Sequence, residues 1–260
     1  MSVKLCRCTL ERFIAPLATQ SANPGLLLRR GLAEYEEGAN QGDSNKGGTG
    51  KSKLIKSIAS CSASPLYQAA FKRWKTATDS DRERFIQFEA DLLGRLYIGL
   101  SHESALETGI SVQHAYGMPM IPGSAIKGLA RSCALEQLKG KADAMTWLFG
   151  NEHDVDTPEQ QETGGIVFHD AWWVPNGKPF VEEIVTPHHT EYYAEGKAHA
   201  TDFDSPIPAP QIAAQGSFLF VLEGNPAWRS IACTLLKSGL ENIGIGGKTT
   251  SGYGLFNTIP

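Results

Sequence analysis

Two glycine-rich stretches of the sequence carry lysine and hydroxyl side chains, a combination that can hold phosphate groups. The first, at residues 45–52, reads NKGGTGKS. In a nucleotide-binding loop, glycine N–H groups cradle the phosphates, Lys51 would reach the outer phosphates, and Ser52 would hold Mg²⁺. Such a loop follows a buried hydrophobic strand, but residues 32–45 are polar and Asn45 stands where the loop has its first glycine. We therefore predict a flexible basic loop here and keep NTP hydrolysis as a remote alternative.

The second stretch, at residues 244–254, reads GIGGKTTSGYG. Its five glycines permit positive φ angles and a close approach of the backbone to a ligand. Lys248 adds a positive charge, and the three residues that follow it add hydroxyl groups. This combination suits a phosphodiester backbone that is bound without sequence preference. The alternative is a tight connection between a helix and a strand.

Histidine and acidic clusters are the candidate metal sites. His188 and His189, with Glu191 and His199 close in sequence, could hold a metal ion, but adjacent histidines are poorly spaced for one tetrahedral site. Residues 152–156 read EHDVD and could hold Mg²⁺, although a solvated acidic turn explains them as well. The five cysteines include no CxxC pair, which argues against a zinc knuckle. We expect neither a metal centre nor a cofactor.

The charge distribution indicates one basic surface on an acidic chain. The formal net charge is −4 over 260 residues, but residues 1–100 hold 15 basic and 10 acidic side chains. Residues 44–78 contain no acidic residue and seven basic ones: Lys46, Lys51, Lys53, Lys56, Lys72, Arg73 and Lys75. This segment predicts a contact with phosphate groups or an acidic partner, or else a solvated face. No apolar run approaches the roughly 18 residues of a membrane span, and the N-terminus lacks a signal-peptide core, so we expect a cytoplasmic protein without a membrane partner.

Three helices are predicted from capping residues and apolar spacing. Ser64 and Pro65 have the types that begin a helix, and the apolar residues that follow recur at helical spacing. Ser124 is predicted to cap a second helix, which ends near Gly140. The pair at residues 225–226, Asn-Pro, predicts the start of a third helix in the same way.

The predicted strands complete an α+β arrangement. Alternating apolar residues predict a strand over residues 86–100, most firmly over 92–100, and shorter strands lie at 164–174, 216–224 and 253–259. The order is then strand, helix, strand, strand, helix, strand, the ferredoxin-like βαββαβ fold, which resembles the RNA-recognition fold (RRM).

This order also predicts the domain organisation. We predict one such domain at residues 86–260, with a long inserted loop or hairpin at about 175–215. Residues 1–85 would form an N-terminal extension, partly helical, that carries the basic loop.

Several motifs resemble the RAMP superfamily of CRISPR proteins. Residues 121–131 read IPGSAIKGLAR, and this family enters a helix through a PGS-xx-KG motif and has a glycine-rich loop before its last strand. The resemblance narrows to the sixth-subunit family of the Cmr complex, the type III-B CRISPR effector. It does so through the segments at residues 99–128, 165–173, 185–193 and 202–210. The N-terminal third matches poorly, apart from NPGLLLRR at residues 23–30.

The resemblance implies a non-catalytic subunit of a ribonucleoprotein. Its partners would be CRISPR guide RNA, target RNA through that guide, and other Cmr subunits that include the filament-forming backbone RAMP subunit. A helix beginning at Ser124 would direct free N–H groups and its positive dipole end at RNA phosphates. The implied RNA contacts are Ser124, Lys127, Gly128, Arg131, Gly244, Gly246, Gly247, Lys248, Thr249, Thr250 and Ser251. Additional candidates for RNA or subunit contacts are His114, Tyr116, His188, His189, Lys46, Lys51 and Lys53.

Catalysis by this chain is the main alternative. The RAMP subunit that slices target RNA uses an aspartate in the loop between its first strand and first helix, whereas residues 101–123 here contain Glu103 and Glu107 but no aspartate. Guide-processing relatives use histidine chemistry, and His102 and His114 lie in this loop, so a metal-independent RNA endonuclease stays open. A polar loop histidine or an RNA contact is the simpler interpretation, and we expect no catalytic residue.

Overall fold

The computed structural model of the chain describes residues 2–4, 23–32, 34–36, 49–102, 104, 106, 108–151, 163–185 and 209–258. The helices are α2 (Pro24–Arg30), α3 (Thr49–Ser60), α4 (Pro65–Ser80), α5 (Gly123–Gln137), α6 (Ala142–Phe149), α8 (Pro226–Asn242) and the 3₁₀ turn η2 (Thr249–Ser251). The strands are β1 (Ser2–Lys4), β2 (Glu34–Glu36), β3 (Phe85–Leu92), β4 (Met120–Ile121), β5 (Ile166–Phe168), β6 (Ala171–Trp173), β7 (Phe180–Val185), β8 (Ala209–Ala214), β9 (Ser217–Gly224) and β10 (Phe256–Thr258).

An antiparallel sheet of six strands forms the centre of the molecule. Its strand order is β10-β3-β9-β6-β4, and β5 also pairs with β9. Five consecutive residues of β9, Phe218 to Leu222, are almost completely buried. A run of this kind, without polar alternation, is typical of a strand that is covered on both faces. The fold is therefore a mixture of helices and antiparallel sheet, as predicted at this level.

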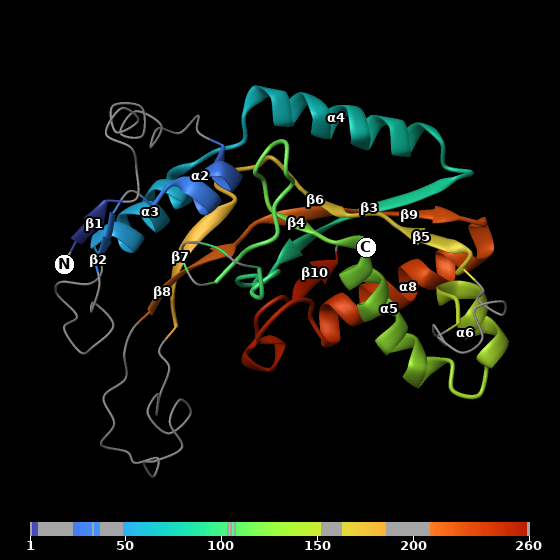
Figure 1. Cartoon of the computed structure of the whole chain (residues 1–260). Coiled ribbons are helices and arrows are strands. Elements are labelled where there is room, and N and C mark those ends of the chain that lie inside the picture. Colours follow the sequence, from blue (N-terminus) through green and yellow to red (C-terminus); the bar gives the residue numbers. More distant parts are fainter. Residues whose placement is uncertain are drawn as a thin grey trace, which may run out of the picture.

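Helices cover both faces of the sheet (Figure 1). α5 and α8 lie on one face and α4 lies along the other. Two neighbouring residues of β3, Glu89 and Phe88, contact the helices on the two opposite faces. Lys75 of α4 forms an ion pair with Glu89 at 2.5 Å, whereas Lys237 of α8 lies 5.0 Å from the ring centre of Phe88. Because neighbouring residues of a strand face opposite sides, these contacts assign one helix layer to each face.

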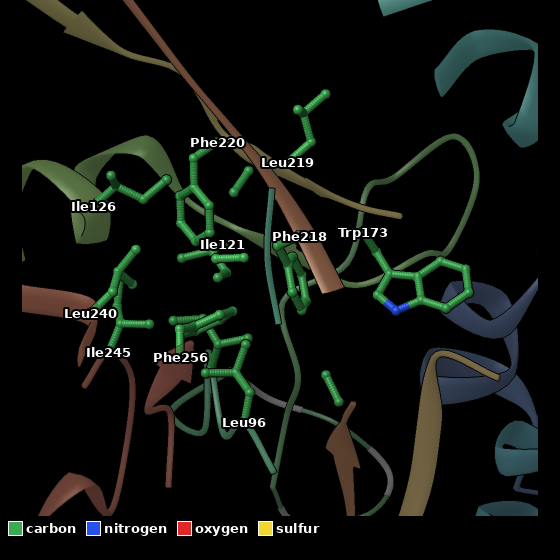
Figure 2. Packing of buried hydrophobic residues seen from close by; sticks show 14 of the residues in the cluster. Leu96, Ile121, Ile126, Trp173, Phe218, Leu219, Phe220, Leu240, Ile245 and Phe256 are labelled. Atoms are coloured by element: carbon green, nitrogen blue, oxygen red, sulfur yellow. The ribbon is translucent and has the colours of Figure 1, made fainter. Parts of the chain in front are cut away.

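The core between the sheet and the α5–α8 layer is built from aromatic and branched side chains (Figure 2). Phe256 of β10 packs edge-on against Phe220 of β9, with ring centres 5.6 Å apart. Trp173 is fully buried, and its indole N–H donates to the carbonyl of Gln215 at 2.8 Å. Its neighbour Trp172 stacks instead under Trp74 of α4, at 6.3 Å. The two tryptophans thus serve opposite faces of one strand.

The N-terminal elements pack onto the rest of the chain. α3 contacts the antiparallel hairpin of β7 and β8, which lies inside the segment predicted as an inserted loop or hairpin. α2 packs on α3, so closely that a Cβ on Gly31 would come within 2.7 Å of Leu54 Cδ1. The structure also places Thr49 to Ser52 in α3, where the sequence predicted a flexible loop. Among the described residues, no helix has both the length and the apolar character that crossing a membrane requires.

Two predicted boundaries are wrong, for tertiary reasons. The strand predicted most firmly over 92–100 ends at Leu92, and Leu96 and Tyr97 make only isolated bridges, to Ala214 and Gly247. Residues 96 to 98 are all buried because neighbours cover both sides of them, so their apolar character did not indicate a strand. The predicted strand at 164–174 is also two short strands, which are separated by His169 and Asp170.

The start of α5 differs from its prediction as well. Ser124 does not cap the helix, because Pro122 holds the N-cap position without any side-chain hydrogen bond. The N–H of Gly123 instead donates to Asp170 Oδ1 at 2.7 Å. A carboxylate of the protein therefore already lies at the positive end of this helix, where the sequence predicted free N–H groups for an external anion.

Candidate nucleic-acid-binding site

A pocket of about 450 Å³ lies between α2 and the segment at residues 98–122. Its lining combines polar and cationic side chains with aliphatic ones. The lining residues are Gly25, Leu28, Arg29, His102, Ser104, Gly109, Ile110, Ser111, Val112, Met120 and Pro122. Pro122 is also the N-cap of α5, so the pocket reaches the helix for which RNA contacts were predicted.

The α2 wall of the pocket is fixed by its first residue. Asn23 caps α2, with its side-chain oxygen accepting from the N–H of Gly25 at 2.8 Å. The same amide group donates to the carbonyl of Ala115 at 3.1 Å. Gly117 has a φ of +71°, and a Cβ there would lie 2.2 Å from Asn23 Oδ1. A side chain at residue 117 would therefore push α2 away from the turn at residues 113–117.

Arg29, which lines the pocket, also contacts His114, which is not one of the lining residues. Arg29 Nη1 lies 3.3 Å from His114 Nδ1. Because a guanidinium has only donors, the imidazole nitrogen is the acceptor in this contact. Both side chains are exposed, so both can also be reached by an anion from solvent.

His102 lies on a surface made by two glycines. Its backbone N–H donates to the carbonyl of Gly99 at 3.0 Å. A Cβ on Gly99 would lie 2.9 Å from His102 Nδ1, and a Cβ on Gly109 would lie 2.6 Å from His102 Cβ. Because these two positions have no side chain, the imidazole of His102 has room to lie against the backbone of the loop.

The predicted contacts on α5 have different exposures. Ser124 and Gly128 are exposed, and a Cβ on Gly128 would meet no heavy atom within 4 Å. Lys127 and Arg131 are half-buried. They are four residues apart and therefore share one face of the helix.

The glycine loop after α8 has a base that is determined by internal packing. Gly246 has a φ of +93°, and a Cβ there would lie 2.2 Å from the carbonyl oxygen of Tyr97. Gly254 has a φ of +71°, and its N–H donates to the carbonyl of Arg95 at 2.8 Å. Gly244, two residues after the end of α8, has a φ of +80° and an N–H that donates to the carbonyl of Gly239 within that helix. These glycines are required by the fold whether or not RNA binds.

The tip of the same loop projects polar groups. Lys248 has a φ of +60°, the only positive value of a non-glycine residue among the described parts of the chain. Its ammonium group lies 5.2 Å from the ring centre of Tyr97. Thr250 and Ser251 follow in η2 and are exposed, and Thr249 is half-buried. The tip thus presents one cation and hydroxyl groups on a short, hydrogen-bonded turn.

One segment of the chain connects the pocket with both predicted groups of RNA contacts. Leu100 touches the glycine loop, since a Cβ on Gly247 would lie 2.7 Å from Leu100 Cδ1. His102 follows two residues later in the pocket wall, and Pro122 borders the pocket at the start of α5. We call the pocket, the α5 start and the loop tip together the candidate RNA surface. Sequence reasoning missed Arg29, although the asparagine cap in NPGLLLRR was a readable signal for the helix that carries it.

Comparison with known proteins identifies the family. Residues 89–257 match the model of the RAMP superfamily. The chain belongs to the RAMP superfamily. It is 27% identical over 217 residues to the CRISPR system Cmr subunit Cmr6 of Pyrococcus furiosus, with 62% of this chain and 64% of that protein covered. It is 30% identical over 198 residues to the Cmr6 of Saccharolobus solfataricus, with 72% and 62% covered.

This RAMP protein therefore spans just under two thirds of the length of these two relatives. Its fold is also found in a solved assembly. A chain in the cryo-EM structure of the type III-B Cmr-beta bound to cognate target RNA superimposes with a TM-score of 0.64 at 23% identity. The match covers 81% of this chain and 71% of that chain.

In this RAMP protein α4 closes one candidate surface. RNA-recognition folds bind single-stranded RNA on the sheet face that lies opposite their helices. Here α4 occupies that face, with Tyr67 buried and its hydroxyl donating to the carbonyl of Trp173 at 2.5 Å. Tyr116, a predicted contact, packs into the same aromatic cluster, 5.6 Å from the ring of Tyr67. The part of the sheet beneath α4 is therefore not open to RNA.

A polar cluster at the end of β9, a strand inside the sheet, is structural. Glu223 of β9 forms an ion pair with Arg84 at 2.6 Å and contacts His169 Nε2 at 2.9 Å. Partial burial alone would raise the pKa of the Glu223 carboxyl, but hydrogen bonds from Arg84 and His169, together with their charges, lower it. The cluster connects the β5–β6 turn to the end of β9.

The remaining predicted contacts are placed as follows. Lys51 and Lys53 lie in α3, and Lys53 is exposed. His188, His189 and Lys46 lie outside the described residues. Within the described parts of the chain, no group of three His, Cys, Asp or Glu side chains could hold a metal ion.

Proposed function

We propose that this chain is a subunit of a type III-B CRISPR ribonucleoprotein that holds guide RNA for pairing with target RNA in antiviral defence. Membership of the RAMP superfamily and similarity to two Cmr6 subunits support the assembly. The observation that carries RNA binding is the loop tip, where Lys248 and exposed hydroxyls project from a base that is fixed by internal packing. Other Cmr subunits, including the filament-forming backbone RAMP subunit, are its proposed neighbours.

We propose a ferredoxin-like βαββαβ unit as the framework of this site. Its first strand would be β3, followed by α5, the short strands β5 and β6, then β9, α8 and β10. The spatial order β10-β3-β9-β6, with every neighbouring pair antiparallel, supports this assignment. The assignment places the start of α5 and the glycine loop, two of the polar parts of the candidate RNA surface, at connections of the unit.

We propose that side-chain charges, more than the dipole of α5, attract the RNA backbone. Asp170 already accepts from the first N–H of this helix, so a phosphate there would also meet a carboxylate. Lys127 and Arg131 lie one and two turns further along, and Lys248 lies on the loop tip. Cations that neutralise phosphates release counterions, which makes the binding sensitive to salt.

Substitution of Lys127 and Lys248 tests the proposal. The double variant Lys127→Ala, Lys248→Ala should bind single-stranded RNA more weakly and flatten the plot of log affinity against log salt by about 1.4, since each phosphate contact contributes about 0.7. The control is Lys139→Ala, Lys141→Ala, which removes the same charge from the turn after α5. If the Lys127 and Lys248 variant matches wild type across the titration, the proposed contacts are misplaced.

We propose that the subunit is not catalytic. The endonuclease alternative needs a histidine that is free to exchange protons with RNA, and His114 already accepts a hydrogen bond from Arg29 at one ring nitrogen. Labelled RNA incubated with wild type and with His114→Ala should stay intact in both cases. Cleavage by wild type that His114→Ala abolishes would show that the protein is an enzyme.

A further inference from the structure

We propose that the pocket between α2 and residues 98–122 binds one nucleotide, with the phosphate at Arg29 and His102 and the base against the aliphatic side. This inference rests on the proposed RNA-binding function and deepens it, because it names the chemical unit that this part of the candidate RNA surface accepts. The pocket volume of about 450 Å³ lies in the range of small-ligand sites, which is roughly 300–1,000 Å³.

The mouth of the pocket fits a phosphate group. Arg29 presents a planar array of donors, which matches phosphate oxygens in a bidentate geometry. His102 lines the same pocket and can donate from its ring. His114 does not line the pocket, but its contact with Arg29 at 3.3 Å helps to position the guanidinium. A phosphate in the pocket would therefore meet the guanidinium of Arg29 and the imidazole of His102.

The inner side of the pocket fits a planar base better than a second charged group. Leu28, Ile110, Val112 and Met120 line it with aliphatic atoms. The hydroxyl of Ser104 is already used, because it donates to the carbonyl of Thr108 at 2.8 Å and accepts from the N–H of Leu106 at 3.1 Å. Beyond the two groups assigned to the phosphate, Ser111 is the other polar side chain of the lining, so few groups can distinguish one base from another and the expected binding depends mainly on shape and phosphate.

The pocket is already formed without a ligand. Asn23 fixes α2 to the turn at residues 113–117, and Gly99 and Gly109 fix His102. Preformed sites bind more tightly because little conformational entropy is lost when the ligand enters. The nucleotide can come from two sources, either a free mononucleotide or an unpaired nucleotide of a bound RNA.

Calorimetric titration of the full chain with AMP, inorganic phosphate and adenosine tests the proposal. AMP should bind more tightly than either fragment. Arg29→Ala should weaken AMP binding by about ten-fold or more, since the charge-assisted hydrogen bonds of the guanidinium are lost. The matched control is Arg30→Ala, because Arg30 is exposed on the same helix but does not line the pocket. His102→Phe, which keeps a ring without its nitrogens, should also weaken AMP and leave adenosine unchanged.

The outcomes separate this proposal from the function on which it rests. Displacement of AMP by unpaired RNA but not by duplex RNA would assign the site to a nucleotide of RNA, and failure of both to compete would assign it to a free mononucleotide. AMP binding no tighter than phosphate, or equal losses in Arg29→Ala and Arg30→Ala, would overturn the nucleotide site. If RNA binding still depended on Lys127 and Lys248 in that case, the proposed RNA-binding function would be kept and only the nucleotide site would be rejected.

Discussion

Two glycines of one loop, Gly254 and Gly252, allow two roles of glycine to be tested apart: close internal packing and close approach to a ligand. Both have left-handed backbones, with φ of +71° and +85°. A Cβ on Gly254 would lie 1.9 Å from the carbonyl oxygen of Ile245, whereas a Cβ on Gly252 would meet no heavy atom within 4 Å. The substitutions Gly254→Ala and Gly252→Ala should therefore carry a similar free-energy cost for the left-handed backbone. Only Gly254→Ala adds a steric clash, between the new Cβ and the carbonyl of Ile245.

The expected losses of stability follow from these contacts. A left-handed backbone costs an alanine roughly 1–2 kcal/mol, and the stiffer unfolded chain offsets about 0.4–1 kcal/mol of this, so Gly252→Ala should lose about 0.5–1 kcal/mol. In Gly254→Ala the Ile245 carbonyl must also move. The hydrogen bonds from Ile245 N to Gly254 O and from Gly254 N to Arg95 O then weaken, at about 1 kcal/mol each. Together with overpacking strain of about 1–3 kcal/mol and the backbone cost of about 0.5–1 kcal/mol, the total loss is about 3.5–6 kcal/mol.

Urea unfolding followed by circular dichroism measures both variants against wild type. Gly254→Ala should unfold at a clearly lower midpoint, and Gly252→Ala should stay close to wild type in stability and in RNA affinity. Equal losses of stability would refute the steric reasoning. A Gly252→Ala protein of wild-type stability that no longer binds RNA would show that this glycine serves ligand approach instead of packing.

Two further substitutions test the polar cluster around Glu223 and the pocket wall. The pKa of Glu223 is lowered in the folded protein, so the unfolded chain takes up the proton first and the wild-type free energy of unfolding should fall as pH drops below the ordinary value of 4.5. Glu223→Gln should flatten this fall in urea titrations at acid pH, and an unchanged slope would contradict the role given to Arg84 and His169. Asn23→Ala removes the cap of α2 and its bond to Ala115, so it should cost about 1 kcal/mol or more and weaken AMP binding. An unchanged melting temperature and AMP affinity would show that Asn23 does not fix the pocket wall.

Helix starts were predictable where the deciding chemistry is local. Ser64 caps α4 by accepting from the N–H of Tyr67 at 3.2 Å, and Asn225 caps α8 by accepting from Ala227 at 3.1 Å. Each cap and the following proline are adjacent in the sequence, so the pattern was sufficient. At α5 the bonded carboxylate belongs to Asp170, 47 residues from Gly123, and no local pattern could show it.

The candidate RNA surface was predictable in its motifs but not in its assembly. The loop tip around Lys248 lies where the glycine-rich motif placed it, because turn residues specify turns locally. The pocket depends instead on the contact between Asn23 and Ala115, which are 92 residues apart. Its two walls come from segments that are far apart in the sequence, and neither sequence pattern indicates that the other segment lies beside it. Their contact is visible only in the folded chain.

Under the proposed function, the N-terminal third determines which surface of the RAMP fold RNA can reach. α2, α3 and α4 all lie before residue 89, where the superfamily match begins. α4 covers the sheet face that RNA-recognition folds leave open, and α2 supplies one wall of the pocket through Arg29. A sheet that is covered on both faces can contact RNA only through its edges and connecting loops. The tip around Lys248 is such a loop, and it carries an exposed cation and exposed hydroxyl groups of the kind that the proposed contact with a phosphodiester backbone requires.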